Sequence, residues 1–236
     1  MNIRILQLIE GVQQADGLVV VIDVFRAFST ACYAMERGAS RIIPVGDIEE
    51  AFRLAEEIPG SVLMGEQNER KITGFDYGNS PTHILGADLS GKTVIHRSSS
   101  GTQGIVNAVH ADEIITGGFV NAAAIAQYIR YRSPETVSLV CMGYAGERPS
   151  QEDTFLAEHI RDLLTGKPTR FDEMVEELRT GDGARLLDPE NSEWSPSSDF
   201  DLCLSLNRFD FILRLEEENG IRYLNRIDSG TFELKK

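Results

Sequence analysis

The chain has 236 residues, which is enough for one good hydrophobic core, alone or with a smaller appendage. Its composition, 42% hydrophobic and 25% charged, is typical of an ordinary globular protein. The net charge of −14 argues against broad nucleic-acid binding, which needs a basic surface. It permits a small anionic substrate, because a site for one needs only a few local cations.

No run approaches the roughly 18 apolar residues of a membrane span, and the first residues lack the pattern of a signal peptide. The three cysteines lie far apart, and Cys32 and Cys141 fall in apolar stretches, as reduced cysteines often do. We therefore expect a cytoplasmic protein with no membrane partner.

Short apolar runs alternate with helical patterns along the chain. The predicted strands cover residues 18–22, 41–45, 62–64, 93–96, 113–116 and 137–142. The predicted helices cover residues 28–37, 48–57, 102–109, 121–132, 152–164 and 172–179. This alternation, with continuously apolar strands, predicts an α/β fold with a mainly parallel sheet layered with helices on both faces.

A weak internal repeat accompanies this alternation. At an offset of 72 residues, Thr30 aligns with Thr102 and residues 42–43 align with residues 114–115. Any two βαβ units share small and apolar residues, so chance similarity is the alternative to duplication. Either way, the alignment pairs the turn at residues 26–30 with the turn at residues 98–102.

The C-terminal part differs in composition. Gly, Asp, Pro and Ser crowd residues 181–198, which predicts a loop or linker. Strand-like runs follow at residues 211–215 and 221–224. We therefore predict an α/β core domain at 1–180, and a loop with a small C-terminal β-containing extension packing on the core at 181–236.

The first candidate site lies where the apolar strand at 18–22 ends. Asp23 follows the strand, Arg26 comes next, and Ser29 and Thr30 stand where a helix begins. Ligands usually bind at such strand ends in open α/β sheets. A carboxylate, a guanidinium and free helix N–H groups together suggest a metal and an anionic substrate.

Three common phosphate-chemistry motifs fail on inspection. Residues 86–93 match the P-loop pattern, but the apolar strand follows the lysine instead of preceding the loop, so a turn is the better interpretation. Six residues separate Cys141 from Arg148, one too many for a cysteine-phosphatase loop. Asp23 is followed two positions later by Phe25, which breaks the aspartyl-phosphatase pattern.

Two loops carry further polar groups. In residues 74–81, Asp76 and Asn79 offer oxygen and amide groups that suit a hard cation, although a stabilising Asx-type turn is the alternative. In residues 97–102, successive hydroxyls and a glycine precede a helix, which makes an anion-binding turn. Simple N-capping by a hydroxyl is the alternative there.

Carboxylates also stand at two other predicted element ends. Glu66 follows a third strand, and Glu152 and Asp153 open a helix. Ser150 with Asp153 fits a capping box, which favours a structural role for Asp153. Glu152 is freer to bind a cation, although a glutamate in the first turn also favours the helix dipole.

In this order, these motifs resemble the 2-phosphosulfolactate phosphatase (ComB) family across more than 200 residues. The matching segments are residues 23–30, 65–66, 74–81, 98–102, 141–146, 152–153 and 203–210. The GFDYGNSP stretch at 74–81 is the most specific of them. The resemblance implies an α/β fold of the family's own type, Mg²⁺ as cofactor, hydrolysis of a small anionic phosphomonoester, and a homodimer.

We assign roles to the matching positions on physical grounds. The predicted catalytic residues are Asp23, Arg26, Glu66 and Asp76. The predicted substrate-binding residues are Arg26, Asn79, Ser99, Ser100, Gly101 and Thr102. The predicted metal ligands are Asp23, Glu66, Asp76, Glu152 and Asp153.

The sequence departs from the family pattern at two places. The family tends to have Gly-Glu-Arg-Gly-Gly where this chain has Gly-Glu-Gln-Asn-Glu at 65–69, so the arginine of the pattern is absent here. The family's Thr-Asn-Gly-Thr becomes Ser-Ser-Gly-Thr at 99–102. These changes leave open a different phosphorylated hydroxy acid as substrate, or a non-catalytic anion-binding homologue. An ATP-dependent enzyme using residues 86–93 is a third alternative.

Overall fold

The computed structural model describes residues 1–232 and forms one ten-stranded sheet layered with helices. Its strands are β1 (Asn2–Gln7), β2 (Gly17–Ile22), β3 (Arg41–Val45), β4 (Val62–Gln67), β5 (Arg70–Lys71), β6 (Thr93–Arg97), β7 (Ala111–Gly117), β8 (Thr136–Cys141), β9 (Phe211–Glu218) and β10 (Ile221–Asp228). Its α-helices are α1 (Leu8–Gln13), α2 (Ala27–Glu36), α3 (Ile48–Glu57), α4 (Pro81–Leu85), α5 (Gly101–Asn107), α6 (Ala122–Arg132), α7 (Gln151–Thr165), α8 (Phe171–Thr180), α9 (Ala184–Leu187) and α10 (Ser198–Cys203). The α/β class with a mainly parallel sheet is confirmed.

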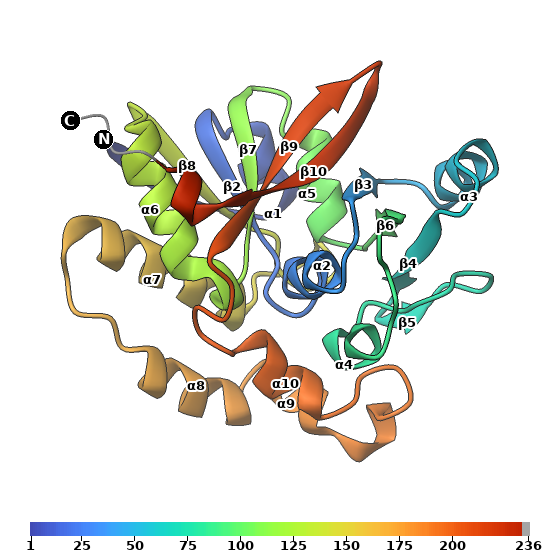
Figure 1. The fold of residues 1–236 in the computed structure, drawn as a ribbon. Coiled ribbons are helices and arrows are strands. Elements are labelled where there is room, and N and C mark those ends of the chain that lie inside the picture. Colours follow the sequence, from blue (N-terminus) through green and yellow to red (C-terminus); the bar gives the residue numbers. More distant parts are fainter. Residues whose placement is uncertain (233–236) are drawn as a thin grey trace.

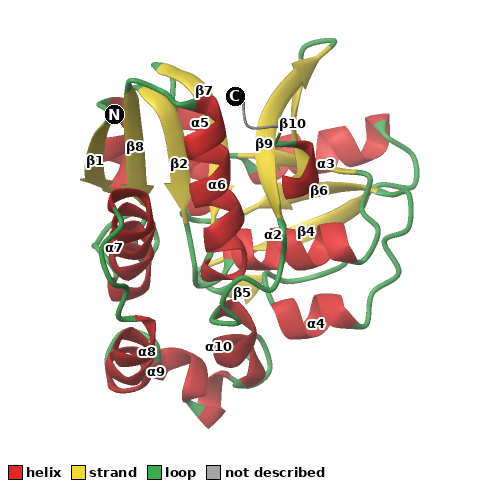
Figure 2. Ribbon diagram, turned by 60° about the vertical axis from the view of Figure 1, so that its left-hand side comes forward, coloured by secondary structure: helices red, strands yellow, loops and turns green. Residues whose placement is uncertain are grey.

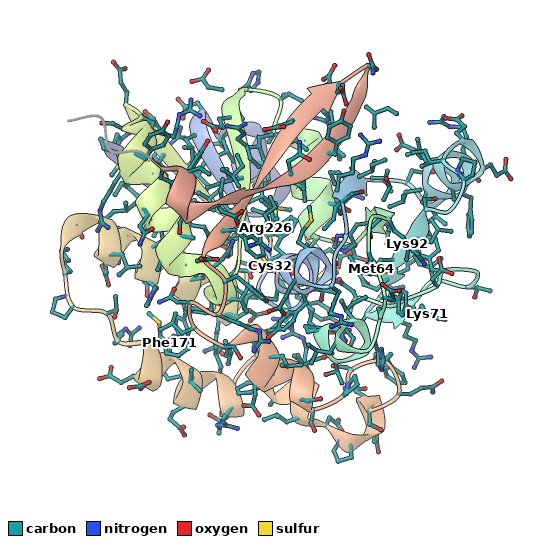
Figure 3. All side chains as sticks on the ribbon, in the orientation of Figure 1. Cys32, Met64, Lys71, Lys92, Phe171 and Arg226 are labelled. Carbon is teal, nitrogen blue, oxygen red and sulfur yellow. The ribbon has the colours of Figure 1, made fainter. Side chains whose placement is uncertain are left out.

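Both faces of the sheet are buried, as the apolar strands predicted. In β2, Val19 and Val21 pack into the same core cluster as α2 and α5 residues. Val20 and Ile22 point to the opposite face and pack with residues of α6 and α7. Because successive side chains of a strand alternate between faces, a sheet covered on both sides needs an unbroken apolar run. The buried Cys32 and Met64 mark the interior in Figure 3.

The strand order supports the internal repeat. The order is β1-β8-β2-β7-β9-β10-β3-β6-β4-β5. The triplet β8-β2-β7 mirrors the triplet β4-β6-β3 on the other side of the β9–β10 hairpin, and all pairs within the two triplets are parallel. Ile42 lies opposite Val94, as Ile114 lies opposite Val19. The two halves of the repeat therefore occupy equivalent places in one sheet.

The C-terminal hairpin is part of the central sheet. Strand β9 pairs with β7 and β10 pairs with β3, so the hairpin joins the two halves of the sheet (Figure 1). The exposed edges left by β7 and β3 explain this, because unpaired strand edges favour strand addition. The division of the chain into domains at residue 180 stays a prediction.

Other elements were missed or had shifted ends. The predicted strands and helices all exist, with bounds that differ by a few residues, but β1, β5, α1, α4, α9 and α10 were not predicted. Residues 86–93 form a turn before β6, as expected. The N–H groups of Leu89 and Gly91 there donate to the carbonyls of Arg37 and Gly38, so they cannot cradle a phosphate.

Helices α8, α9 and α10 lie together at one end of the molecule in both Figure 1 and Figure 2. In Figure 2 the arrowheads of β1, β8 and β2 point toward this end. The segment that follows α7 therefore covers the side of the sheet where its parallel strands end, which is the side that usually binds ligands.

Candidate active site

A cavity of about 60 Å³ lies at the carboxyl ends of the parallel strands. Its lining comes from the segments at the ends of β2, β4, β6 and β8 and from the loop before α4. The lining residues are Asp23, Phe25, Arg26, Glu66, Asn68, Glu69, Asn79, Ser99, Ser100, Gly143, Tyr144 and Ala145. Six of the predicted site residues thus meet in one place: Asp23, Arg26, Glu66, Asn79, Ser99 and Ser100.

Asp23 joins the two turns that the repeat paired. Its Oδ1 accepts from the N–H of Ala27 (3.1 Å), and its Oδ2 accepts from the N–H of Gly101 (2.8 Å). The first bond closes the start of α2 and the second ties Asp23 to the start of α5. Burial, together with the nearby charges of Glu66 and Glu152, raises the pKa of Asp23 to about 7. Such a carboxyl can exchange a proton near neutral pH.

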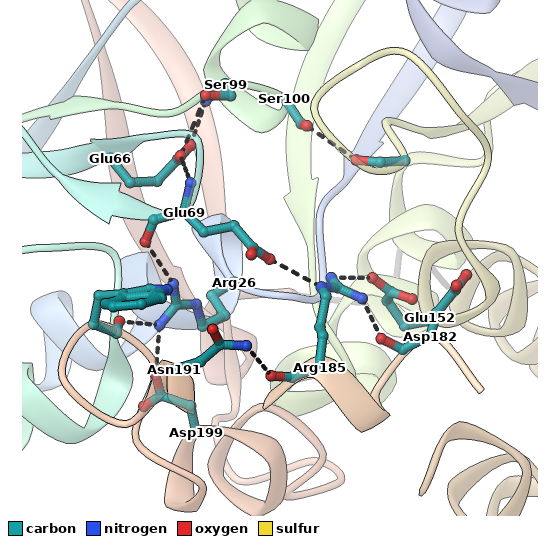
Figure 4. Close-up of polar contacts among 12 residues, drawn as sticks. Arg26, Glu66, Glu69, Ser99, Ser100, Glu152, Asp182, Arg185, Asn191 and Asp199 are labelled. Atoms are coloured by element: carbon teal, nitrogen blue, oxygen red, sulfur yellow. Dashed lines mark hydrogen bonds and ion pairs between the residues drawn. The ribbon is translucent and has the colours of Figure 1, made fainter. Parts of the chain in front are cut away.

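Glu66 holds the hydroxyl-rich turn against β4. Its Oε1 accepts from the N–H of Ser99 (2.5 Å), while its Oε2 accepts from the N–H of Glu69 (2.7 Å) and the Ser99 hydroxyl (3.2 Å). Figure 4 shows Glu66 and Ser99 in contact beside Glu69. Glu66 therefore positions both the anion-binding turn and the loop after β4.

The neighbouring carboxylates Asp153 and Glu152 have different surroundings. The two oxygens of Asp153 accept from the N–H groups of Val24 and Gly143, both at 2.8 Å. Burial and the Glu152 and Asp23 charges raise the pKa of Asp153 well above its usual value. The neighbouring Glu152 is buried and pairs through Oε1 with Arg185 (2.9 Å), but its buried Oε2 has no hydrogen-bond partner. An unpartnered buried carboxylate oxygen is costly unless something else binds it.

Arg26 faces the cavity, yet its guanidinium is already engaged. Its Nη1 donates to Asp199 Oδ2 (2.8 Å) and to the carbonyl of Trp194 (2.7 Å), and its Nη2 donates to the carbonyl of Glu69 (3.1 Å). Asp199 is fully buried. Arg26 therefore anchors the segment before α10 over the site and supplies positive charge to the cavity wall.

Of the remaining predicted residues, Ser100 and Asn79 line the cavity and Thr102 does not. Ser100 donates to the Gly143 carbonyl (2.9 Å), and Asn79 Oδ1 lies 3.2 Å from His96 Nε2. Thr102 is buried inside its own turn, where its hydroxyl donates to the Ser98 carbonyl (3.0 Å). It does not line the cavity, so its contribution is the shape of the turn.

Asp76 is outside the site. It is exposed, its Oδ2 accepts from the N–H of Leu63 (2.8 Å), and it lines a separate pocket of about 410 Å³. Arg70, the first arginine after the altered segment at 65–69, lines that same pocket and stacks on Trp194 at 4.3 Å. Asp76 thus ties its loop to β4 through the Leu63 N–H, which is neither the metal ligation that we predicted nor the Asx-type turn that was the alternative.

Sequence reasoning missed three residues that shape the site: Glu69, Arg185 and Asp199. Arg185 and Asp199 belong to the segment that we predicted as loop and extension. One signal was available, because Arg185 is the only basic residue between Arg179 and Arg208 in an otherwise acidic stretch. A lone cation in such a stretch favours a specific acidic partner.

The donor set suits a magnesium ion. The described part of the chain holds no group of three or more His, Cys, Asp or Glu side chains arranged to hold a metal by themselves. Mg²⁺ does not need such a cage, because it keeps several waters and binds through one or two carboxylates and phosphate oxygens. The unpartnered Glu152 Oε2 is the one oxygen that could take this role, and it lies behind the residues that line the cavity, bonded through Oε1 to Arg185.

No helix in residues 1–232 combines the length and apolarity needed to cross a membrane.

Comparisons with known proteins identify the family of this chain. A relative from Thermotoga petrophila, named probable 2-phosphosulfolactate phosphatase, is 44% identical over 138 residues, which cover 58% of each chain. A relative of the same name from Caldanaerobacter subterraneus is 32% identical over 86% of this chain and 88% of its own. One from Bacillus subtilis is 28% identical over 88% and 91%. The family model described as 2-phosphosulpholactate phosphatase matches residues 3–218, and the chain belongs to that family.

Proposed function

We propose that this protein is a Mg²⁺-dependent phosphatase that hydrolyses a small anionic phosphomonoester. Water attacks phosphorus, the ester P–O bond breaks, and the products are an alcohol and inorganic phosphate. The observation that carries the proposal is the buried Asp23, tied to the Ser99–Gly101 turn beside Arg26 at the carboxyl ends of the strands. The family and the names of its relatives support the reaction class.

Each residue has a role that follows from its contacts. Asp23 faces the cavity with a pKa near 7, so it orients the attacking water and takes its proton. Arg26 supplies positive charge beside the phosphate, and the hydroxyls of Ser99 and Ser100 stabilise its equatorial oxygens once they turn from Glu66 and the Gly143 carbonyl, to which they donate in the free protein. Glu66 and Asp153 hold these groups in place through their bonds to backbone N–H groups.

Glu152 is our candidate ligand for Mg²⁺, through the oxygen that has no protein partner. When bound, the ion neutralises charge on a phosphate oxygen. Asp23, Glu66 and Asp153 were also candidate ligands. Backbone N–H groups engage both oxygens of each, so these three carboxylates also position the surrounding backbone, and Glu152 Oε2 is the one oxygen of the four candidates that lacks such a partner.

A panel of phosphomonoesters that includes phosphosulfolactate and phospholactate tests the proposal, with phosphate release measured with Mg²⁺ and with EDTA. We expect release that needs Mg²⁺ and that falls at least 100-fold in Asp23→Asn. Folded protein that releases no phosphate from any ester with Mg²⁺ would refute it. A ligand-induced thermal shift without turnover would instead indicate an anion-binding homologue.

Two further proposals rest on the resemblance and on composition alone. We propose a homodimer, which sedimentation equilibrium tests, and a cytoplasmic location, which fractionation of the source cells tests.

A further inference from the structure

The loop after β4 places a carboxylate across the site. Glu69 lies in the left-handed region with φ 66°, where the family pattern has glycine. Its N–H donates to Glu66 and its carbonyl accepts from Arg26, so its backbone is held at both ends. The side chain then reaches Arg185, whose Nε lies 3.0 Å from Glu69 Oε1 (Figure 4).

Arg185 is held between two carboxylates of unequal exposure. Its Nη2 lies 2.9 Å from Glu152 Oε1, and its Nη1 donates to the carbonyl of Asp182. The Glu152 side chain is 3% exposed, whereas the Glu69 side chain is 31% exposed. Exposed ion pairs are weak and exchange readily, while buried ones persist. Glu69 is therefore the partner that Arg185 can release.

The cations around the cavity do not have equal freedom. The Nη atoms of Arg26 already serve Asp199, the Trp194 carbonyl and the Glu69 carbonyl. Arg185 stacks over Phe25 and Tyr144, two cavity-lining rings, at 5.6 and 5.3 Å. If Glu69 withdraws, Nη1 and Nη2 of Arg185 stay bound to Asp182 and Glu152, and the Nε–H is free to donate to an anion that takes the place of the Glu69 carboxylate.

The cavity is too small to hold a substrate unless part of its lining moves. About 60 Å³ is well below the roughly 300 Å³ at which ligand sites begin. Glu69 and the loop that carries it fill part of the space between Asn68 and Tyr144, all of which line the cavity. A substrate of several non-hydrogen atoms must displace part of this lining, and the Glu69–Arg185 pair is more exposed than the Glu152–Arg185 pair.

We propose that Arg185 is a specificity-determining residue that binds a second anionic group of the substrate, a carboxylate or sulfonate, in the place that the Glu69 carboxylate holds in the free protein. A planar guanidinium fork matches such groups. The inference rests on the proposed phosphatase function. Arg185 supplies, from a distant segment, the positive charge that the family pattern carries as arginine where this chain has Gln67.

Two matched substrates test the inference: O-phospholactate, and isopropyl phosphate, in which a methyl group replaces the carboxylate. In Arg185→Met we expect kcat/KM for O-phospholactate to fall about 10- to 100-fold relative to that for isopropyl phosphate, the value of a hydrogen-bonded charge. In Glu69→Gln the same ratio should rise, because a competitor for Arg185 is removed. Arg185→Lys should recover only part of the loss, since an ammonium lacks the fork.

Arg148→Met is the matched control. Arg148 stacks over the same Tyr144 ring at 4.7 Å and pairs with the side chain of Asp182, but its side chain is 52% exposed and it contacts neither Glu69 nor Glu152. It should leave the substrate ratio unchanged. Equal effects of Arg185→Met on both substrates, or a ratio unchanged in Glu69→Gln, would overturn the inference while leaving the phosphatase function standing. No turnover of any ester by the wild type would refute the proposed function and the inference with it.

Discussion

The ion pair between Arg26 and Asp199 yields the sharpest prediction for stability. The two side chains are 4% and 0% exposed, and Arg26 Nη1 lies 2.8 Å from Asp199 Oδ2. Arg26→Ala leaves the Asp199 charge buried without its partner, which costs about 3–5 kcal/mol. For a chain of this length, 1 kcal/mol corresponds to roughly 2 °C in Tm, so we expect Tm to fall by about 6–10 °C.

A second substitution tests the reason for the loss. The Ser80 hydroxyl, the Thr82 N–H and the Thr82 hydroxyl all donate to Oδ1 of Asp199, and only Arg26 among the residues of this cluster donates its side chain to Oδ2. Asp199→Asn can keep the three Oδ1 bonds while removing the charge. Added to Arg26→Ala, it should therefore recover most of the lost stability instead of adding to the loss.

Differential scanning calorimetry of the wild type, both single variants and the double variant measures these effects. Arg53→Ala is the control, because its pair with Glu57 is more than half exposed and is worth under about 1 kcal/mol. If Arg26→Ala shifts Tm by no more than Arg53→Ala does, the burial argument fails. Because Arg26→Ala also removes the buried pair with Asp199 and lowers stability, its loss of activity has to be normalised to the fraction of protein that is folded.

Three further predictions concern the site and pH. Asp23→Asn should lower kcat/KM by about 10²- to 10⁴-fold, whereas Asp76→Asn should change it by less than about threefold. Equal losses in the two variants would show that Asp76 takes part in catalysis. A Cβ on Gly101 would lie 2.9 Å from Asp23 Oδ2, whereas one on Gly86 meets nothing within 4 Å. Steady-state assays should therefore show about a 100-fold loss in Gly101→Ala and none in Gly86→Ala, and similar losses in the two would contradict the contact. Burial lowers the pKa of His96 in the folded protein to about 3, below the 6.5 of an unfolded histidine. As pH falls below about 6.5, His96 gains a proton in the unfolded state but not in the folded state, so the folded protein loses stability. Urea unfolding at pH 7 and pH 5 should show the wild type losing about 2 kcal/mol more than His96→Gln, and equal losses would refute neutral burial.

Much of the site could be predicted because it lies at the ends of strands with local signals. An apolar run followed by Asp23 indicated a strand end, and the repeat paired that turn with residues 98–102. In the structure the Gly101 N–H donates to Asp23 Oδ2, so the two turns are in direct contact. Asp76 lines a different pocket and accepts from the Leu63 N–H of β4, a contact between distant residues that the spacing within residues 74–81 could not reveal.

The sequence alone determined the α/β class, the order of the repeated units and the strand end at Asp23, because these follow from apolar periodicity and local turn chemistry. Only the tertiary structure decided where the C-terminal hairpin pairs and which cations reach the site. Arg26 and Asp199 are 173 positions apart, and Arg185 and Glu69 are 116 apart. No periodicity reports such contacts, because they depend on how the halves of the sheet and the segment after α7 come together in space.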